Sequence, residues 1–151
     1  MSINMSEDFA KYLVSKNYIA GDLISKLDLP NVQNTGQTLR RLWELTDLSA
    51  NDFADEVARF HGIPRMSLAQ LMETSALVGR FSRRFLREMV VFPYETADGQ
   101  FQLAVADPND AAPVQAAEIV LGGRVTVTIA SFEDIATVLT ARIGDDDSAL
   151  P

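Results

Sequence analysis

FQLAVADPNDAAPVQAAEIVLGGRVTVTIASFEDIATVLTARIG, residues 101–144, is the stretch that decides the fold of this chain. Its apolar run at residues 101–106 predicts a strand. That strand stops at Pro108, because proline has no N–H to donate to a sheet and biases the preceding residue away from helix. At residues 124–130, apolar and polar side chains alternate, as they do in a half-buried strand. A helical segment ending at Leu121 joins the two strands, so the order strand, helix, strand is expected.

The last helix is expected to begin at Ser131. Serine is a favoured capping residue, and an acidic residue follows three positions later at Asp134, which is typical of a helix N-terminus. Apolar residues then recur at helical spacing, at Ile135, Val138, Leu139 and Ile143. The chain therefore closes with a strand–helix–strand–helix unit, and something upstream must cover its other edge.

Upstream of this unit, residues 90–94 predict a strand and Asp98-Gly99 a turn, so residues 90–106 form an antiparallel hairpin. Before the hairpin, residues 77–88 predict a helix whose inward side chains are Val78, Phe81, Phe85 and Leu86. A shorter helix is expected after the serine and glutamine of a capping box at residues 67–70.

The first part of the chain repeats a helix–turn–helix pattern. A helix capped by Ser6 is expected to end at Asn17, and a second helix to start at Ile19. A polar loop is predicted at residues 30–37 from its proline, amides, threonine and glycine. The same helix–turn–helix pattern then recurs, and its two copies are offset by about 29 residues.

In the second copy, residues 38–45 predict a helix, and Ser49 caps another helix that carries Phe53 and Val57. Gly62 ends that helix, and a proline follows shortly after, which is the usual order at a helix C-terminus. Two such helical hairpins suffice for a small helical subdomain.

The fold class expected from these elements is α+β, with a helical subdomain packed on a small three-stranded sheet and flanking helices. We place the helical subdomain at residues 1–64 and the α+β subdomain, in the order α-β-β-α-β-α, at residues 65–144. Residues 145–151 begin with three aspartates and are expected to be an acidic tail or a linker.

Composition excludes several classes of function. The 151 residues carry a net charge of −8, which argues against generic nucleic-acid binding because that needs a basic surface. The chain has no cysteine, so disulfides and zinc–cysteine sites are excluded. The N-terminus lacks the features of a signal peptide, and no apolar run approaches the 18 or so residues of a membrane span. A cytoplasmic module is expected.

Two features are candidates for partner binding. Arg80, Arg83, Arg84 and Arg87 fall at i, i+3, i+4 and i+7 of the predicted helix, which makes one helix face basic. This face either docks an acidic partner segment or a phosphate group, or is an ordinary solvated surface. Trp43 either packs in the helical core or anchors a partner helix. We expect no catalytic, cofactor-binding or metal-binding residue, since neither a nucleophile–base pair nor a ligand cluster is visible.

The order of these motifs resembles a known family. HGIP at residues 61–64, VVFPYETADGQFQLAVADPND at residues 90–110 and GGRVTVTIASFEDIATVL at residues 122–139 are similar to the N-terminal domain of type II secretion and type IV pilus assembly ATPases. The same domain also occurs fused to membrane glycosyltransferases. The resemblance implies a docking and regulatory role, with a cytoplasmic region of an inner-membrane platform protein as the partner.

Some members of that family bind cyclic di-GMP through paired motifs of the form R-L-G-x-x-L-x-x-x-G. In the first copy here, the arginine and the two glycines are replaced by Asp8, Ala10 and Asn17. In the second copy, the equivalent residues are Thr38, Arg40 and Asp47. Glycine lets a backbone approach a nucleotide, and arginine pairs with phosphate. These substitutions argue against cyclic di-GMP binding, which stays an alternative.

The sequence thus predicts a non-catalytic docking or regulatory module of a secretion or pilus ATPase. The alternatives are the regulatory domain of a membrane glycosyltransferase in polysaccharide export, and a cyclic di-GMP sensor. The chain carries no nucleotide-binding P-loop motif, so we expect no ATP hydrolysis from it.

Overall fold

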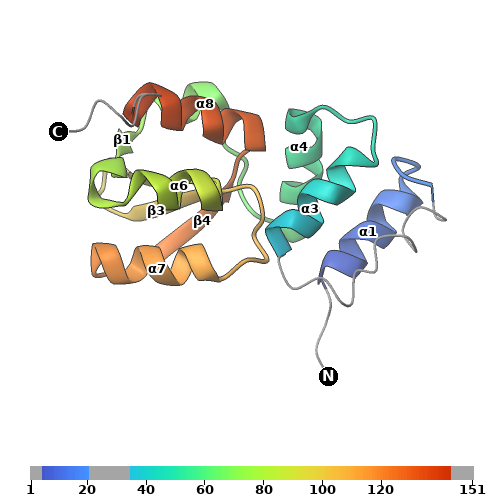
Figure 1. The fold of residues 1–151 in the computed structure, drawn as a ribbon, viewed down its shortest axis with the longest axis horizontal. Coiled ribbons are helices and arrows are strands. Elements are labelled where there is room, and N and C mark those ends of the chain that lie inside the picture. Colours follow the sequence, from blue (N-terminus) through green and yellow to red (C-terminus); the bar gives the residue numbers. More distant parts are fainter. Residues whose placement is uncertain (1–4, 21–34, 144–151) are drawn as a thin grey trace.

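A computed structural model describes residues 5–20 and 35–143 of the chain (Figure 1). The helices are α1 (Met5–Ser15), α3 (Thr35–Glu44), α4 (Ala50–His61), α5 (Leu68–Met72), the 3-10 turn η3 (Val78–Arg80), α6 (Arg83–Met89), α7 (Ala112–Leu121) and α8 (Phe132–Ile143). The strands are β1 (Ser75–Ala76), β2 (Val91–Glu95), β3 (Phe101–Val105) and β4 (Val125–Ile129). The predicted α+β class is confirmed.

The four strands form one sheet in the order β1-β2-β3-β4. The hairpin of β2 and β3 is antiparallel, with Val91 opposite Val105. β4 pairs with β3 in parallel after the crossover through α7, with Val105 beside Ile129. The prediction of three strands missed β1, which pairs with the far end of β2. β1 has only two residues, too few for side-chain alternation to show in the sequence.

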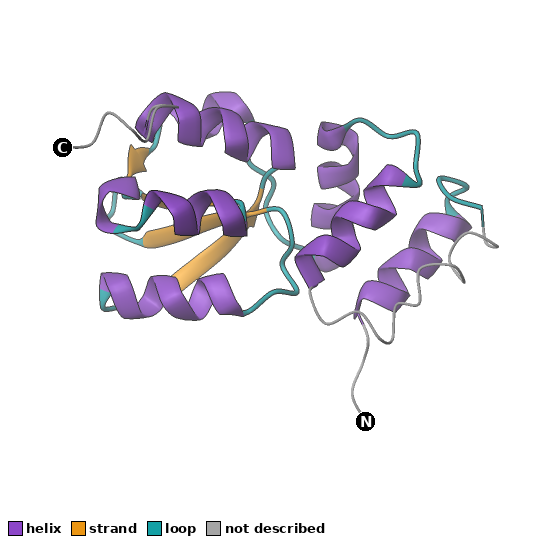
Figure 2. Cartoon of the chain, viewed as in Figure 1, coloured by secondary structure: helices purple, strands orange, loops and turns teal. Residues whose placement is uncertain are grey.

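Helices lie on both sides of the sheet, and α1, α3 and α4 gather at one end of the molecule (Figures 1 and 2). α6 and α8 contact β2, whereas α7 contacts β3 and β4. α4 contacts both β4 and α8, so this helical group of α1, α3 and α4 is joined to the sheet through α4. One core runs through both parts, and its largest fully buried side chains include Phe9, Phe53, Phe92, Leu103 and Ile135.

Local capping explains where several helices begin and end. The Ser49 hydroxyl accepts a hydrogen bond of 3.0 Å from the N–H of Asp52 at the start of α4. Ser67 and Gln70 form the predicted capping box of α5. The Ser131 hydroxyl accepts from the N–H of Asp134 at the start of α8. The predicted caps at Ser49, Ser67 and Ser131 are thus confirmed.

The predicted helix over residues 77–88 is wrong as one element. The chain forms η3, extends at Phe81, and begins a new helix at α6. Ser82 causes this break, because its hydroxyl accepts the Phe85 N–H at 3.1 Å and so caps a new N-terminus. α6 then ends at Val90, which has φ 55°, an uncommon left-handed conformation for a β-branched residue.

Two further boundaries differ in the first part of the chain. α1 begins at Met5, so Ser6 lies within the first turn of the helix and not before it. α3 begins at Thr35, so the end of the loop predicted at residues 30–37 is helical. The helix expected to start at Ile19 falls on residues 21–34, which lie outside the described residues. Asn17 ends α1 as predicted, with φ 65°.

Candidate functional site

The end of α4 turns the chain sharply toward the sheet. Gly62 has φ 67°, a left-handed conformation that glycine adopts without strain, and Ile63 donates its N–H to the Ala58 carbonyl at 3.1 Å. The chain then runs beside the end of β4, where Pro64 O accepts the Ile129 N–H at 2.8 Å. This arrangement fixes residues 62–66 between the helical group and the sheet.

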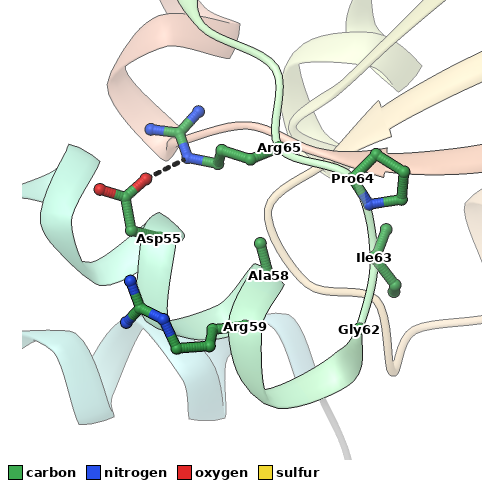
Figure 3. A pocket seen from close by; sticks show the side chains of 7 residues that line it. All are labelled: Asp55, Ala58, Arg59, Gly62, Ile63, Pro64 and Arg65. Carbon is green, nitrogen blue, oxygen red and sulfur yellow. Dashed lines mark hydrogen bonds and ion pairs between the residues drawn. The ribbon is translucent and has the colours of Figure 1, made fainter.

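A shallow pocket of about 480 Å³ lies in the angle of this turn (Figure 3). It is lined by Asp55, Ala58, Arg59, Gly62, Ile63, Pro64 and Arg65. Figure 3 shows Ala58 pointing into the space between α4 and the following segment, with the two arginine side chains at one side. The pocket therefore combines an aliphatic floor with two guanidinium groups.

Arg65 is held in place by three neighbours. Its Nε donates to Asp55 Oδ1 at 2.9 Å, one terminal nitrogen donates to the Asn51 carbonyl at 3.3 Å, and the other donates to the Met66 carbonyl. The Arg65 side chain is only 22% exposed. A guanidinium fixed by several bonds loses little conformational entropy when it binds an anion.

Arg59 is held from behind by Glu56. Its terminal nitrogen donates to Glu56 Oε2 at 2.5 Å, while 61% of the Arg59 side chain is exposed. Glu56 is 7% exposed and also accepts hydrogen bonds from the hydroxyls of Tyr12 at 2.6 Å and Tyr18 at 3.3 Å. Burial alone would raise the pKa of Glu56, but these hydrogen bonds and the Arg59 charge outweigh it and lower the pKa. The carboxylate is thus ionised and joins α1 to α4.

The arginines singled out from the sequence do not share one helix face. Arg80 lies in η3, and Arg83, Arg84 and Arg87 lie in α6 after the break at Ser82. Arg80 and Arg84 are exposed, whereas Arg83 and Arg87 are half-buried and have interactions of their own. The Arg84 Nε donates to Glu88 Oε1 at 2.9 Å on the open surface, a type of pair that contributes little to stability.

Trp43 is half-buried where α3 meets α8. Its Nε1 donates to the Leu48 carbonyl at 2.9 Å, and its ring centre lies 6.0 Å from that of Phe132. The guanidinium carbon of Arg40 lies over the Phe132 ring, 4.7 Å from the ring centre. Trp43 therefore packs between the helical group and the sheet part of the fold, and a partner could reach only its exposed portion.

His61 and the acidic loop after β3 have structural partners. His61 Nδ1 donates to the Val57 carbonyl at 3.0 Å, and its ring contacts Phe9 and Phe60. Asp107 Oδ1 accepts the Asn109 N–H at 2.9 Å within a turn. Within the described part of the chain, no three His, Asp or Glu residues are grouped so that they could hold a metal ion.

Residues 61–149 match the sequence profile of the MshEN domain. The chain belongs to the MshEN domain family. The resemblance to N-terminal domains of type II secretion and type IV pilus assembly ATPases is thereby confirmed. No curated protein sequence matches this MshEN domain significantly.

Solved structures share the fold of this MshEN domain. A structure of the N-terminal domain of XpsE has a TM-score of 0.70 at 22% identity and covers 92% of this chain and 96% of that one. A second crystal form of the same XpsE domain has a TM-score of 0.59 at 23% identity, and the match covers 92% of this chain and 97% of that one. A structure of MshE with cdg has a TM-score of 0.59 at 15% identity, and the match covers 88% of this chain and 96% of that one.

Sequence reasoning missed Glu56, Arg59 and Arg65 of this MshEN domain. The spacing of Glu56 and Arg59 on one helix could have indicated an ion pair. The contact with Tyr12 spans 44 positions, and no local pattern shows it. Among residues 5–20 and 35–143, the structure has no helix with the length and apolar character that a membrane crossing requires.

Proposed function

We propose that this MshEN domain is a non-catalytic docking and regulatory module of a bacterial type II secretion or type IV pilus assembly ATPase. Its partner in this proposal is a cytoplasmic part of the inner-membrane platform, so the domain works in the cytoplasm at the membrane face. The observation that carries the proposal is the match of residues 61–149 to the MshEN family, together with the fold shared with the XpsE N-terminal domain.

The placement of the ionisable groups supports a non-catalytic role. Glu56 is a buried acid of the helical group, yet it faces two tyrosines and an arginine and does not line the pocket. The pocket itself is open and shallow, so it offers surface for contact and does not enclose a substrate. We expect no ATP turnover from the chain by itself.

Arg80 and Arg84 are the exposed arginines of the predicted basic surface, and they carry the docking test. Calorimetry would measure binding of the platform protein's cytoplasmic domain to the chain and to the double variant Arg80→Glu/Arg84→Glu. We expect the variant to bind at least about tenfold more weakly, because rim charges guide and orient association. The double variant Arg41→Glu/Arg124→Glu, which changes two exposed arginines elsewhere and alters the net charge by the same amount, is the matched control. Equal affinity of all three proteins would remove these arginines from the docking surface.

Cyclic di-GMP sensing is the second candidate function, because the fold matches a structure of MshE with cdg. Asn17 also supports it: with φ 65° it keeps the left-handed turn that the motif's last glycine would make. The buried Ala10 and the exposed Asp8, which replace the glycine and the arginine of the motif, oppose it. Titration of the chain with cyclic di-GMP decides between the two functions: docking alone predicts no binding heat, and saturable heat supports the sensor.

A further inference from the structure

The surface formed by η3 and α6 carries an excess of positive charge. Residues 77–90 hold four arginines and one glutamate, in a chain whose net charge is −8. That glutamate, Glu88, pairs with Arg84. The arginines of this η3–α6 surface therefore outnumber the carboxylate that the same segment supplies, and the surface attracts negative charge.

Arg83 and Arg87 are the arginines of this surface that most need a counter-charge. They lie one turn apart on α6, between the buried Leu86 and the exposed Arg84, and both are half-buried. Each has an interaction of its own. A charge that is partly withdrawn from water requires a charged or hydrogen-bonding partner, whereas water solvates an exposed one. A carboxylate is the partner that matches a guanidinium best.

The end of α8 lies beside this surface. Arg142, in the last turn of α8, donates to the carbonyls of Met72 and Thr74, so the helix ends next to the segment that leads into β1 and η3. α8 contacts both η3 and α6. Figure 1 shows the end of α8, β1 and the beginning of α6 on the same side of the molecule, away from α3 and α4. The chain therefore leaves α8 close to the arginines.

An acidic segment follows α8 almost at once. Its three aspartates, residues 145–147, begin two positions after Ile143, the last residue of the helix. An extended chain spans about 3.5 Å per residue, so these residues come within about 7 to 14 Å of the helix end. Negative charge just after a helix C-terminus is unfavourable, because the helix dipole is negative there. A nearby cation therefore stabilises the aspartates, and the short tether gives them an effective concentration of about millimolar.

We propose that the acidic segment, residues 145–147, binds Arg83 and Arg87 of α6 and so competes with an acidic partner for the η3–α6 surface. The inference rests on the proposed docking function and adds a regulation of its basic surface. The chain's own carboxylates occupy the surface until a partner displaces them. Half-buried guanidinium groups favour this contact over one on the open surface, because salt and water screen it less.

Two triple variants of the full chain carry the test. The first removes the charges of the acidic segment and is Asp145→Asn/Asp146→Asn/Asp147→Asn. The control removes three exposed acids of the helical group and is Glu44→Gln/Asp47→Asn/Asp52→Asn. Both variants change the net charge by the same amount, so a difference between them reports the position of the charges and not their number.

NMR of the arginine side chains tests the contact itself. We expect the Nε–H signals of Arg83 and Arg87 to shift in the acidic-segment variant and to stay in place in the control variant. Raising the salt concentration of the parent chain should move the same signals toward their positions in the acidic-segment variant, because salt screens the ion pairs. Unchanged signals in that variant, or a shift confined to Arg142, would overturn the proposal.

A capped peptide of six aspartates tests the competition. We expect it to bind the acidic-segment variant at least about fivefold more tightly than the parent chain, because a surface that is open part of the time binds in proportion to the open fraction. The control variant should bind the peptide with the affinity of the parent chain. Equal affinity of the parent chain and the acidic-segment variant would overturn the proposal.

The outcome is distinguishable from failure of the docking function. If the platform domain binds the parent chain and the acidic-segment variant with equal affinity, the segment does not regulate docking, so this proposal fails and docking stands. If the NMR and peptide results hold but the platform domain binds neither protein, the docking proposal fails and the contact between the acidic segment and α6 stands.

Discussion

The Tyr12 hydroxyl donates a hydrogen bond of 2.6 Å to Oε1 of Glu56, and this contact joins α1 to α4 across 44 positions of the chain. Glu56 is 7% exposed, so its charge depends on the groups that surround it. Arg59, which holds the other carboxylate oxygen, also lines the pocket after α4. The packing of the first helix and the position of Arg59 at the pocket thus depend on one carboxylate.

Loss of the Tyr12 hydroxyl should destabilise the fold. Tyr12→Phe keeps the ring packed on Phe9 and Phe60 but leaves a buried carboxylate oxygen without its donor. We expect the free energy of unfolding to fall by about 1.5 kcal/mol or more, as for hydrogen bonds to charged groups. Urea denaturation followed by circular dichroism measures it. Tyr18→Phe, which removes the longer bond of 3.3 Å, should have a smaller effect, and the reverse order would contradict this account.

Stability should fall in acid because of Glu56. The pKa of Glu56 is lowered in the fold, since the hydrogen bonds and the Arg59 charge outweigh the effect of burial. A lowered pKa gives a stabilisation that is complete above the ordinary carboxyl pKa of about 4.3 and is lost as pH falls through the folded value. Glu56→Gln should therefore be less stable than the parent chain at neutral pH, and the difference should shrink below about pH 4. A difference that stays constant over this range would contradict the assignment.

The ring of Phe132 should link the helical group to α8. Phe132→Leu removes the contact with Trp43, whose ring centre lies 6.0 Å away, and the cation–π contact with Arg40. We expect a loss of about 1 kcal/mol in unfolding free energy and a red shift of the emission of Trp43, the single tryptophan of the chain. Phe81→Leu, a change in the segment between η3 and α6, is the control, and it should leave the emission of Trp43 unchanged.

Any side chain at position 62 should destabilise the fold, because of the backbone conformation there and not because of a clash. No atom lies within 4 Å of a Cβ built on Gly62, so there is space for a side chain. Its φ of 67°, however, is a backbone conformation that is strained for any residue with a Cβ. Gly62→Ala should cost about 1 kcal/mol of unfolding free energy. Gly79 is the matched control, since it has equal space and no positive φ, so Gly79→Ala should cost less. Similar costs for both variants, measured by thermal unfolding, would show that φ is not the cause.

The sequence predicted features that depend on neighbouring residues. Ser49, Ser67 and Ser131 cap helices with atoms only three residues away, and the hairpin of β2 and β3 follows from the Asp98-Gly99 turn between two apolar runs. These signals are local, so a single sequence carries them.

The rest depends on contacts between distant residues. The helix predicted over residues 77–88 has good helical spacing, but the Leu77 N–H pairs with the distant Pro93 carbonyl. The cap at Ser82, which starts a second helix, is a local signal that the prediction from spacing overlooked. The pocket arises where residues 62–65 meet α4 and β4, through the bond of Ile129 to Pro64. Spacing along the chain could not place Arg59 beside Arg65 in one pocket, because the turn at Gly62 sets their positions.

Calorimetry of the full chain with the cytoplasmic domain of the inner-membrane platform protein tests the central claim most directly. The account predicts saturable binding near one to one, weakened by Arg80→Glu/Arg84→Glu and unaffected by cyclic di-GMP. Absence of binding heat at high protein concentration, with saturable heat on titration of cyclic di-GMP into the same sample, would contradict it.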